Sequence, residues 1–458
     1  MTIIPHWLTK HSVMGHLQLA LPLCLVHLGQ QFMAMVDIAM LGNHSKTALA
    51  GAGIGANYVF VVQIVCAGFL LSLDATIPKA VGQDNQGLAW TIYRKGLKLA
   101  FFFTLPATLI ILLGPFIVNG NLMTPAIANE FSSYVYPRML GTLPYLLFYV
   151  QRSFLQANNN TRPIVYVIVL ANVLNLLLDA LFIHGDGALA WLGMGGIGVP
   201  AMGSFGAGLA TSLVSLFSVF FLGLFIKKPT NGSHSQRFSS KTLMIIGLPI
   251  AGQLLIECGI FGLTGFLSGL LGETPAAAHQ IALSIASLSF ASALGMATAT
   301  AVRVGHNLGK GNPSAAKDAG WVGIFLGTLI MAASGLLFIL APEFLTGFFS
   351  RSNEILNLAN KLLLVAALFQ LSDAVQVIAA GALRGAGVTK PAFYSNLIGH
   401  YLFGLPIGLF LAFRFDFGAV GLWWGLSGGL TLVAIILLVV FKQAFKSIIS
   451  GTSEATKG

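Results

Sequence analysis

The sequence predicts an all-α membrane protein with twelve transmembrane helices in two pseudo-symmetric lobes of six. Two observations predict this fold: apolar runs recur along the whole chain, and the same short motifs occur in both halves. The 458 residues are 56% hydrophobic and only 8% charged, with a mean hydropathy of +0.84, whereas soluble domains carry roughly 25% charged residues. Because about 20 apolar residues in a helix cross the hydrocarbon core, each run predicts one span.

The spans follow one another with short connections. Six are centred near residues 28, 62, 106, 144, 173 and 214, and six near residues 257, 289, 329, 372, 402 and 430. We expect an N-terminal lobe at 1–226, a cytoplasmic linker at 227–242 (KKPTNGSHSQRFSSKT), a C-terminal lobe at 243–446 and a cytoplasmic tail at 447–458. The residues before Leu17 lack the short apolar core of a removable signal peptide.

The basic residues predict the orientation. If the N-terminus is cytoplasmic and the spans alternate, 19 of the 24 Lys and Arg face the cytoplasm, and the outer side holds Lys46, Arg138, Arg351, Lys361 and Arg414. This bias places both termini inside. Cytoplasmic loops facing anionic lipid explain the net charge of +10, so nucleic acid is not an expected partner. The three cysteines lie in apolar runs without a CxxC pair, which indicates buried free thiols.

The two halves repeat the same motifs. ALPLCL with Pro22 matches GLPIAG with Pro249, IPKAVGQDN matches AVRVGHNLG, and LQANNNTRP matches LRGAGVTKP, at nearly one offset. These matches indicate duplication. An even number of spans per half gives parallel repeats with a cavity between lobes, an arrangement common in secondary transporters. Pro22 and Pro249 fall inside spans, where each predicts a kink or local unwinding.

Five acidic residues interrupt apolar runs, although the chain has only 14 Asp and Glu: Asp37, Asp74, Asp179, Glu257 and Asp373. A carboxylate at bilayer depth is costly, and such residues usually mark ion or substrate pathways. Asp74 is the weakest candidate, because it is near Lys79 at the predicted cytoplasmic end of its span and reads as an interfacial acid.

Polar residues recur on one face of two spans in the first half. Asn172, Asn175 and Asp179 are spaced i, i+3, i+7, and Gln30 and Asp37 are seven residues apart. Asp37 and Asp179 are both predicted to lie in the outer half of their spans, so their side chains could be in contact. Such a cluster could bind Na⁺ through hard oxygen ligands or hold a proton shared by two carboxylates. A purely structural hydrogen-bond network is the alternative.

In the second half, Glu257 and Asp373 have no basic residue at comparable depth in their own helices. Each must therefore be protonated, ion-bound or facing water. His279 and Gln280 begin the eighth predicted span, where a histidine is more often a packing residue than a ligand. No HExxH, GxSxG or Walker loop supports an enzyme or an ATP-driven pump. A lipid-linked sugar flippase and a non-transporting sensor remain as alternatives. The flippase needs cationic groups for pyrophosphate, whereas the deep charges are expected to be acidic.

The runs GLPIAGQLLIECGIF, AAAHQIALSIASLSFASALGMATATAVRVGHNLGKGN and QVIAAGALRGAGVTKP resemble multidrug and toxic compound extrusion (MATE) transporters of the NorM branch. The resemblance covers essentially the whole chain. It implies drug export driven by inward Na⁺ or H⁺, with Asp37, Glu257 and Asp373 at coupling or drug-binding positions and Gln280 lining the cavity. Gln30, Asn175, Asp179 and Thr211 resemble the N-lobe cluster of the DinF branch. The segment around Asp74 departs from the NorM pattern.

Taken with this resemblance, the sequence predicts a cation-coupled antiporter in a bacterial inner membrane. We expect it to be a monomer that exports amphipathic organic cations, with H⁺ or Na⁺ as coupling ion and no other cofactor. The coupling residues are expected to be Asp37, Asn175, Asp179, Glu257 and Asp373, with Na⁺ at Glu257 and Asp373 or at Asp37 and Asp179. The expected substrate-binding residues are Gln30, Asp37, Asn172, Thr211, His279 and Gln280.

Overall fold

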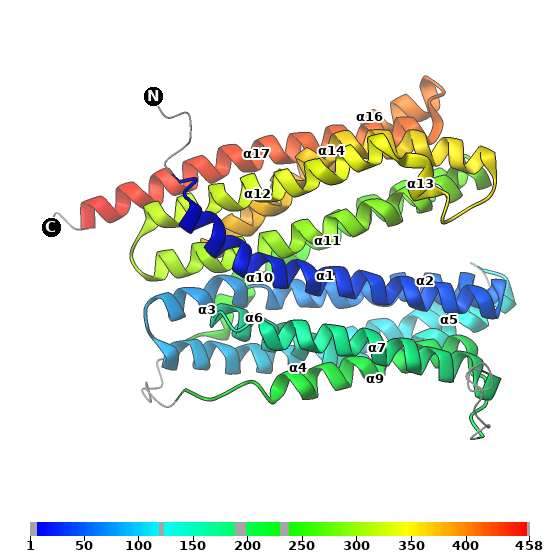
Figure 1. Ribbon diagram of the computed structural model, residues 1–458, viewed down its shortest axis with the longest axis horizontal. Coiled ribbons are helices and arrows are strands. Elements are labelled where there is room, and N and C mark those ends of the chain that lie inside the picture. Colours follow the sequence, from blue (N-terminus) through cyan, green and yellow to red (C-terminus); the bar gives the residue numbers. More distant parts are fainter. Residues whose placement is uncertain (1–6, 119–122, 188–197, 230–237, 456–458) are drawn as a thin grey trace. The chain divides into compact units, whose positions relative to one another are not determined.

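A computed structural model describes residues 7–118, 123–187, 198–229 and 238–455. This part of the chain is helical and without strands, which confirms the predicted fold class (Figure 1). Eleven of its helices are long and apolar enough to cross a membrane. The helices are α1 Lys10–His44, α2 Lys46–Leu70, α3 Leu73–Gly82, α4 Gln86–Val118, α5 Pro125–Arg138, α6 Thr142–Ala157, α7 Arg162–His184, α9 Gly203–Gly223, α10 Ser240–Leu270, α11 Glu273–Gly309, α12 Pro313–Leu340, α13 Pro342–Thr346, α14 Asn353–Gly385, α15 Lys390–Asn396, α16 Leu405–Leu409 and α17 Gly418–Ala455.

The predicted fourth span is present as a broken helix. A 3₁₀ turn at Met139–Gly141, labelled η1, separates α5 from α6. Pro137, near the end of α5, and Pro144, the third residue of α6, both lack the N–H that would continue the α-helical hydrogen bonds. Neither α5 nor α6 alone is long enough to cross a bilayer, so this span is not among the eleven. Together the two pieces correspond to the fourth of the twelve predicted spans.

The chain divides into two compact units, and the second is formed by 29–73 and 86–244. Within this unit α5 packs against α2 and α9, α7 packs against α9, and α4 packs against α6. Small residues allow the closest approaches: a Cβ added to Gly208 of α9 would lie 2.5 Å from the carbonyl oxygen of Tyr134 in α5. Small residues at this contact let the backbones of α5 and α9 approach closely, which also brings their facing side chains close together.

The first unit is formed by 1–28, 74–85 and 245–458. Within it α14 packs against α11, α12 and α17 (Figure 1). The beginning of α1 packs on α11, where a Cβ on Gly295 would lie 2.4 Å from the backbone nitrogen of Cys24. α3 also contacts the end of α11, since a Cβ on Gly309 would lie 2.2 Å from the carbonyl oxygen of Lys79. Two segments from the first half of the sequence therefore belong to the core of this unit.

The span from 390 to 414 departs from regular α-helix. Two π-helical turns, η2 Leu397–Gly404 and η3 Phe410–Arg414, flank α16. The wider backbone of η2 packs against glycines of α17; a Cβ on Gly425 would lie 2.5 Å from the carbonyl oxygen of Gly404. In contrast, α1 and α10 stay helical through Pro22 and Pro249, so the local unwinding expected there is not found.

The predicted domain boundaries stay a prediction. The two units meet in the sequence at residue 244, just after the predicted linker, but they also exchange the segments described above. Residues 230–237 of the linker lie outside the described residues. The predicted tail from 447 continues helix α17 as far as Ala455, so its described part is helical.

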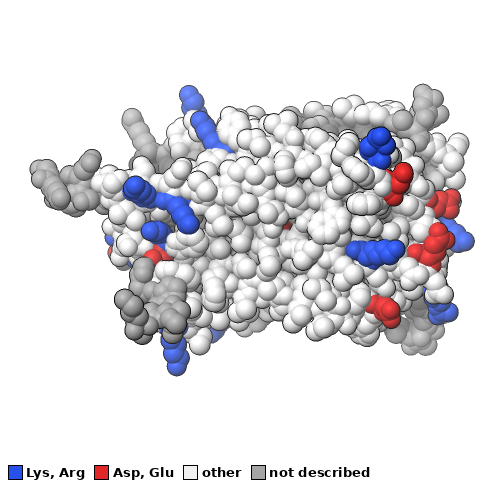
Figure 2. Space-filling model, turned by 90° about the horizontal axis from the view of Figure 1, so that it is seen from above, with Lys and Arg blue, Asp and Glu red and all other residues white. Residues whose placement is uncertain are grey.

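The surface carries a broad apolar zone. On the face drawn in Figure 2, Lys, Arg, Asp and Glu gather at the two ends and the surface between them is almost entirely uncharged. Phe102, Leu105 and Phe220 are each more than 60% exposed. Large apolar side chains in such positions are expected on membrane-spanning helices that face lipid. All three cysteines are free; Cys24 and Cys66 are buried, as predicted, whereas Cys258 is half-buried.

Candidate functional site

The second unit brings together the acids that the sequence placed on two helices. Asp37 of α1 and Asp179 of α7 are buried, and their carboxyl groups are close enough to interact. Asn175, one turn before Asp179, is fully buried and also reaches Asp37. Neither oxygen of Asp179 and neither atom of the Asn175 amide has a hydrogen-bond partner of good geometry. Buried polar atoms are almost always paired, so this cluster has the free oxygens needed to hold a proton or a small cation.

Thr211 of α9 completes this acid cluster. Its hydroxyl lies 3.1 Å from Oδ2 of Asp37 and 2.9 Å from the carbonyl oxygen of Ala207. Asn172 is half-buried, and its side-chain Nδ2 donates to the carbonyl of Ile168. Its Oδ1 has no hydrogen-bond partner. Gln30 is half-buried on α1. The structure thus places Asp37, Asn175, Asp179 and Thr211 in one cluster, while the roles of Gln30 and Asn172 stay predictions.

Arg138 lies in a different environment from the one that the sequence analysis expected. It was counted among the basic residues of the outer side, but it lies at the end of α5, inside the broken fourth span, and is only 8% exposed. At 1.5 Å per residue it lies ~20 Å along the helix from Pro125. Its Nη2 donates to Oε1 of Gln63 at 3.3 Å, and its Nε and Nη1 have no hydrogen-bond partner.

Arg152 is a second buried cation on the same broken span. It is 1% exposed, and its guanidinium lies 4.5 Å from the ring centroid of Tyr149. The expectation that the deep charges are acidic is therefore wrong in this unit. The span that the sequence centred near residue 144 begins at Pro125 in the structure, so Arg138 lies within it rather than at its end.

The first unit holds a second acid cluster. The side-chain amide of Gln376 donates to Oε1 of Glu257 at 3.1 Å and to Oδ1 of Asp373 at 3.2 Å. Glu257 comes from α10 and Asp373 from α14, and all three side chains are buried. Gln253, one turn before Glu257, interacts with it as well. Gln376 was missed by the sequence analysis, although its i+3 spacing from Asp373 was visible.

Asp74 does not join either cluster. It is fully buried at the start of α3, whereas Lys79 is exposed. Its interpretation as an interfacial acid near Lys79 stays a prediction, but Asp74 itself is buried in the protein. The reason is that α3 packs against the end of α11, where Gly82 and Gly309 allow the two helix backbones to meet. This packing removes Asp74 from the surface, which a hydropathy profile cannot show.

His279 and Gln280 lie at the beginning of α11 and have different environments. His279 is 2% exposed, and its Nδ1 accepts a hydrogen bond of 3.1 Å from the indole N–H of Trp423. That bond fixes the ring within an apolar cluster that includes Phe369 and Ala366. Gln280 is exposed. The contacts of His279 match a packing residue, and substrate binding by either residue stays a prediction.

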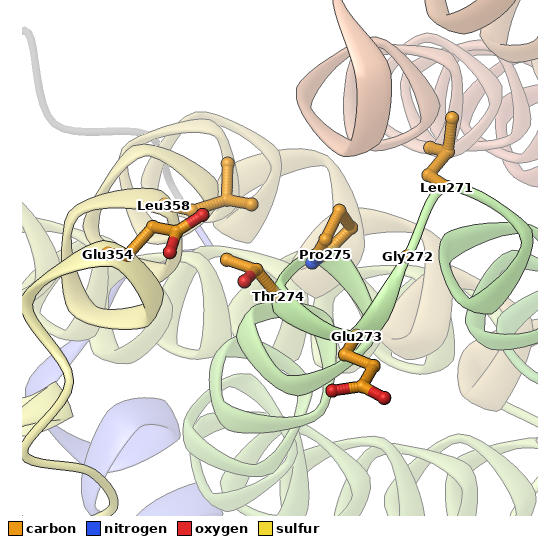
Figure 3. Close-up of a pocket in the computed structure, with 7 residues that line it drawn as sticks. All are labelled: Leu271, Gly272, Glu273, Thr274, Pro275, Glu354 and Leu358. Atoms are coloured by element: carbon orange, nitrogen blue, oxygen red, sulfur yellow. The ribbon is translucent and has the colours of Figure 1, made fainter.

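Two cavities lie away from the acid clusters. The larger, of about 460 Å³, is open and lies where α11 and α14 begin (Figure 3). Glu354 and Leu358 project from α14 toward Thr274 and Pro275, and the carboxylate of Glu273 points away from that of Glu354. The smaller, of about 310 Å³, is lined by residues that include Trp7, Ser12 and Arg303. In the described residues no group of three or more His, Cys, Asp and Glu forms a metal site.

Comparison with known proteins decides the family. The family model MatE matches residues 22–181 and again residues 249–410. The chain belongs to the MatE family. The second match begins 227 residues after the first (residue 249 against residue 22), which confirms the duplication seen in the sequence. Members of this family are membrane transporters, so this MatE chain is a transporter and not an enzyme.

Relatives align with this MatE chain over nearly its full length. It is 35% identical to a probable multidrug resistance protein NorM of Mesorhizobium japonicum, with 95% of this chain and 94% of the relative covered. It is 33% identical to a protein of the same description from Pseudomonas putida, with 96% of both chains covered. These relatives confirm the NorM-like resemblance.

Solved structures share the fold. The crystal structure of the eukaryotic MATE transporter AtDTX14 superimposes with a TM-score of 0.84 at 21% identity, covering 96% of this chain and 99% of that one. A MOP superfamily transporter from Pyrococcus furiosus, described as having a binding pocket of reverse polarity, gives a TM-score of 0.84 at 19% identity, with 95% of this chain and 96% of that one covered.

Proposed function

We propose that this MatE-family transporter is a multidrug efflux antiporter that exports amphipathic organic cations in exchange for an inward-moving H⁺ or Na⁺. The relatives described as multidrug resistance proteins NorM support drug efflux. The observation that carries ion coupling is the buried cluster of Asp37, Asn175 and Asp179, whose free oxygens need a proton or cation. A charge at this depth without such a partner would be strongly destabilising.

The coupling ion of the second unit is proposed to be a proton. Two interacting carboxyl groups in a low dielectric share one proton more readily than they ionise together. The hydroxyl of Thr211 is compatible with this choice, because it lies within hydrogen-bond distance of both Asp37 and the carbonyl oxygen of Ala207. When it donates to Ala207, it can accept a hydrogen bond from a protonated Asp37.

The cluster of the first unit is the alternative coupling site and is proposed for Na⁺. Glu257 and Asp373 each keep one carboxylate oxygen that Gln376 does not use. Carboxylate and amide oxygens are ligands that hard cations prefer. Under this alternative the two acids bind Na⁺ while Gln376 holds them at a fixed separation.

Substrate binding is proposed to involve the polar residues predicted from the sequence, together with aromatic side chains. The predicted set is Gln30, Asp37, Asn172, Thr211, His279 and Gln280. An apolar pocket with a few polar groups suits amphipathic ligands. We propose that the protein acts as a monomer in a bacterial inner membrane with both termini in the cytoplasm, as the basic residues of the loops predict.

A lipid-linked sugar flippase is the second candidate function, and one observation favours it. Arg138 and Arg152 are buried cations in the second unit, and each has nitrogens without hydrogen-bond partners. Guanidinium groups bind phosphate well. The acids still outnumber these arginines at the two clusters, so export of cations remains the proposal.

Transport by the purified protein in liposomes tests the proposal. An ethidium-like cation is loaded, and a Na⁺ gradient and a pH gradient are imposed separately on wild type, Asp37→Asn, Asp179→Asn, Glu257→Gln and Asp373→Asn. We expect a pH gradient to drive efflux and the first two variants to abolish it. Loss confined to Glu257→Gln and Asp373→Asn, with Na⁺ alone sufficient, would move coupling to the first unit. Movement of lipid-linked sugar without cation flux would support the flippase.

A further inference from the structure

Arg138 is a buried cation whose surroundings lack an anion bonded to it. Its only described hydrogen bond goes to the neutral amide oxygen of Gln63, at 3.3 Å. Its Nε and Nη1 are buried without a partner. Leaving a buried charge unpaired is strongly unfavourable, so this arginine is expected to have an ionic partner in another state of the transport cycle.

The surroundings of Arg138 lead to Asp37 by two short steps. A Cβ on Gly141 would lie 3.2 Å from Nη1 of Arg138 and 2.9 Å from the hydroxyl oxygen of Ser212, so the guanidinium and Ser212 occupy the same small space. Ser212 follows Thr211, whose hydroxyl contacts Asp37. Arg138 is also close enough to Asp37 to attract it electrostatically. All of these residues belong to the second unit.

The backbone beside Arg138 is suited to a change of side-chain direction. α5 ends at Arg138, and the 3₁₀ turn Met139–Gly141 follows before α6 begins. Ser212 donates to the carbonyl of Pro137 at 2.8 Å, a bond that ties the end of α5 to α9. A 3₁₀ stretch inside a longer helix often marks a functional hinge. The guanidinium thus lies at this break, in the same unit as the acid cluster.

We propose that Arg138 is an internal counter-ion that pairs with Asp37 when the coupling ion leaves the acid cluster. The guanidinium replaces the lost positive charge, so the carboxylate is never left unpaired in the membrane. When the coupling ion returns, Arg138 withdraws to Gln63, its hydrogen-bond partner at 3.3 Å. Arg138 acts through Asp37 and is a positioning residue rather than a binding residue for drug.

This proposal rests on the proposed function of the acid cluster. Several titratable and polar groups face Arg138. These are Asp37 on α1, Tyr134 on α5 and Tyr145 on α6, while α2 and α9 present the uncharged Gln63 and Ser212. Asp37 is the acid of this set. If Arg138 pairs with Asp37, the effects of substituting these two residues on stability should not be additive.

A double-mutant cycle in thermal stability tests the ion pair without requiring transport. The Tm of the full chain in detergent is measured at alkaline pH without Na⁺ for wild type, Asp37→Asn, Arg138→Gln and the double variant. We expect Arg138→Gln to lower Tm by several degrees when Asp37 is present and to have little effect when it is Asn. Arg152→Gln is the matched control: it removes a buried arginine from the same span, and its effect should add to that of Asp37→Asn.

Efflux provides the second readout. Arg138→Gln should slow ion-driven efflux of an ethidium-like cation about tenfold and leave its Kd unchanged, because Arg138 acts on ion release rather than drug binding. Arg138→Lys should recover much of the rate, since it restores the charge. Additive stabilities in the cycle would overturn the ion pair, as would equal coupling with Arg152→Gln. If the coupling is found but Asp37→Asn still exports the drug, the ion pair stands and the proposed N-lobe coupling fails.

Discussion

The hydroxyl oxygen of Thr211 lies 3.1 Å from Oδ2 of Asp37. The same oxygen lies 2.9 Å from the carbonyl oxygen of Ala207, one turn earlier on α9. A hydroxyl carries one proton, so it cannot donate fully to both oxygens. Donation to Ala207 makes Thr211 an acceptor for a protonated Asp37, and donation to Asp37 stabilises its carboxylate. Thr211 can therefore support either state of Asp37 by rotating its hydroxyl.

We predict that Thr211→Val lowers ion-driven efflux about tenfold, the effect of losing ~1.4 kcal/mol of stabilisation. Val has nearly the same shape as Thr but lacks the hydroxyl that contacts Asp37. Thr211→Ser should keep most of the activity. Ser215→Ala is the control, because Ser215 donates only to the backbone of Thr211. Efflux from liposomes is the measurement, and equal rates for Thr211→Val and wild type would contradict the role of the hydroxyl.

Gln376 links the two acids of the first unit, and we predict that Gln376→Leu destabilises the protein by about 1–3 kcal/mol. The reason is that Glu257 and Asp373 would both lose a buried hydrogen-bond donor. The measurement is the Tm of the purified protein. Gln376→Leu should lose more stability than Gln370→Leu, a change on the same helix at a glutamine that contacts Ser289 instead. A smaller loss for Gln376→Leu would show that the acids do not depend on this amide.

The contact of α3 with α11 depends on glycine, and we predict that Gly309→Ala lowers stability by about 1–3 kcal/mol. Its Cβ would lie 2.2 Å from the carbonyl oxygen of Lys79, a backbone atom that cannot move away easily. Gly262→Ala on α10 is the control, because its Cβ would meet no atom within 4 Å. We expect that control to be neutral or slightly stabilising, since alanine favours helix over glycine. Thermal unfolding of both variants provides the comparison.

Substitutions at Trp423 and His279 can distinguish a packing role of His279 from a role in substrate binding. We predict that Trp423→Phe lowers stability by about 1–3 kcal/mol, because Nδ1 of the buried His279 loses its donor. If His279 is a packing residue, as its contacts indicate, His279→Phe should lower Tm and leave the Kd for an ethidium-like cation within twofold of wild type. A drop of tenfold or more in affinity, with Tm unchanged, would instead assign His279 to the substrate site.

The sequence by itself determined the membrane class, the number of spans, the duplication and the acids worth examining. These features are local or repeated, because hydropathy sums over about 20 neighbouring residues and a repeat needs no knowledge of contacts. The pairing of Asp37 with Asp179 could also be foreseen, since helix periodicity and depth constrain both residues. The family match at residues 22–181 and 249–410 confirmed the duplication independently.

Only the tertiary structure decided which polar groups meet and which charges are deep. Arg138 became a buried cation because the fourth span begins at Pro125 and includes it, and Asp74 became buried because α3 packs on α11 through Gly82 and Gly309. Gln376 joined Glu257 because α10 and α14 are neighbours in space. Such contacts join residues far apart in the chain, and burial depends on the partner surface as much as on the residue itself. A hydropathy profile averaged over neighbouring residues contains no information about such contacts or about the partner surface.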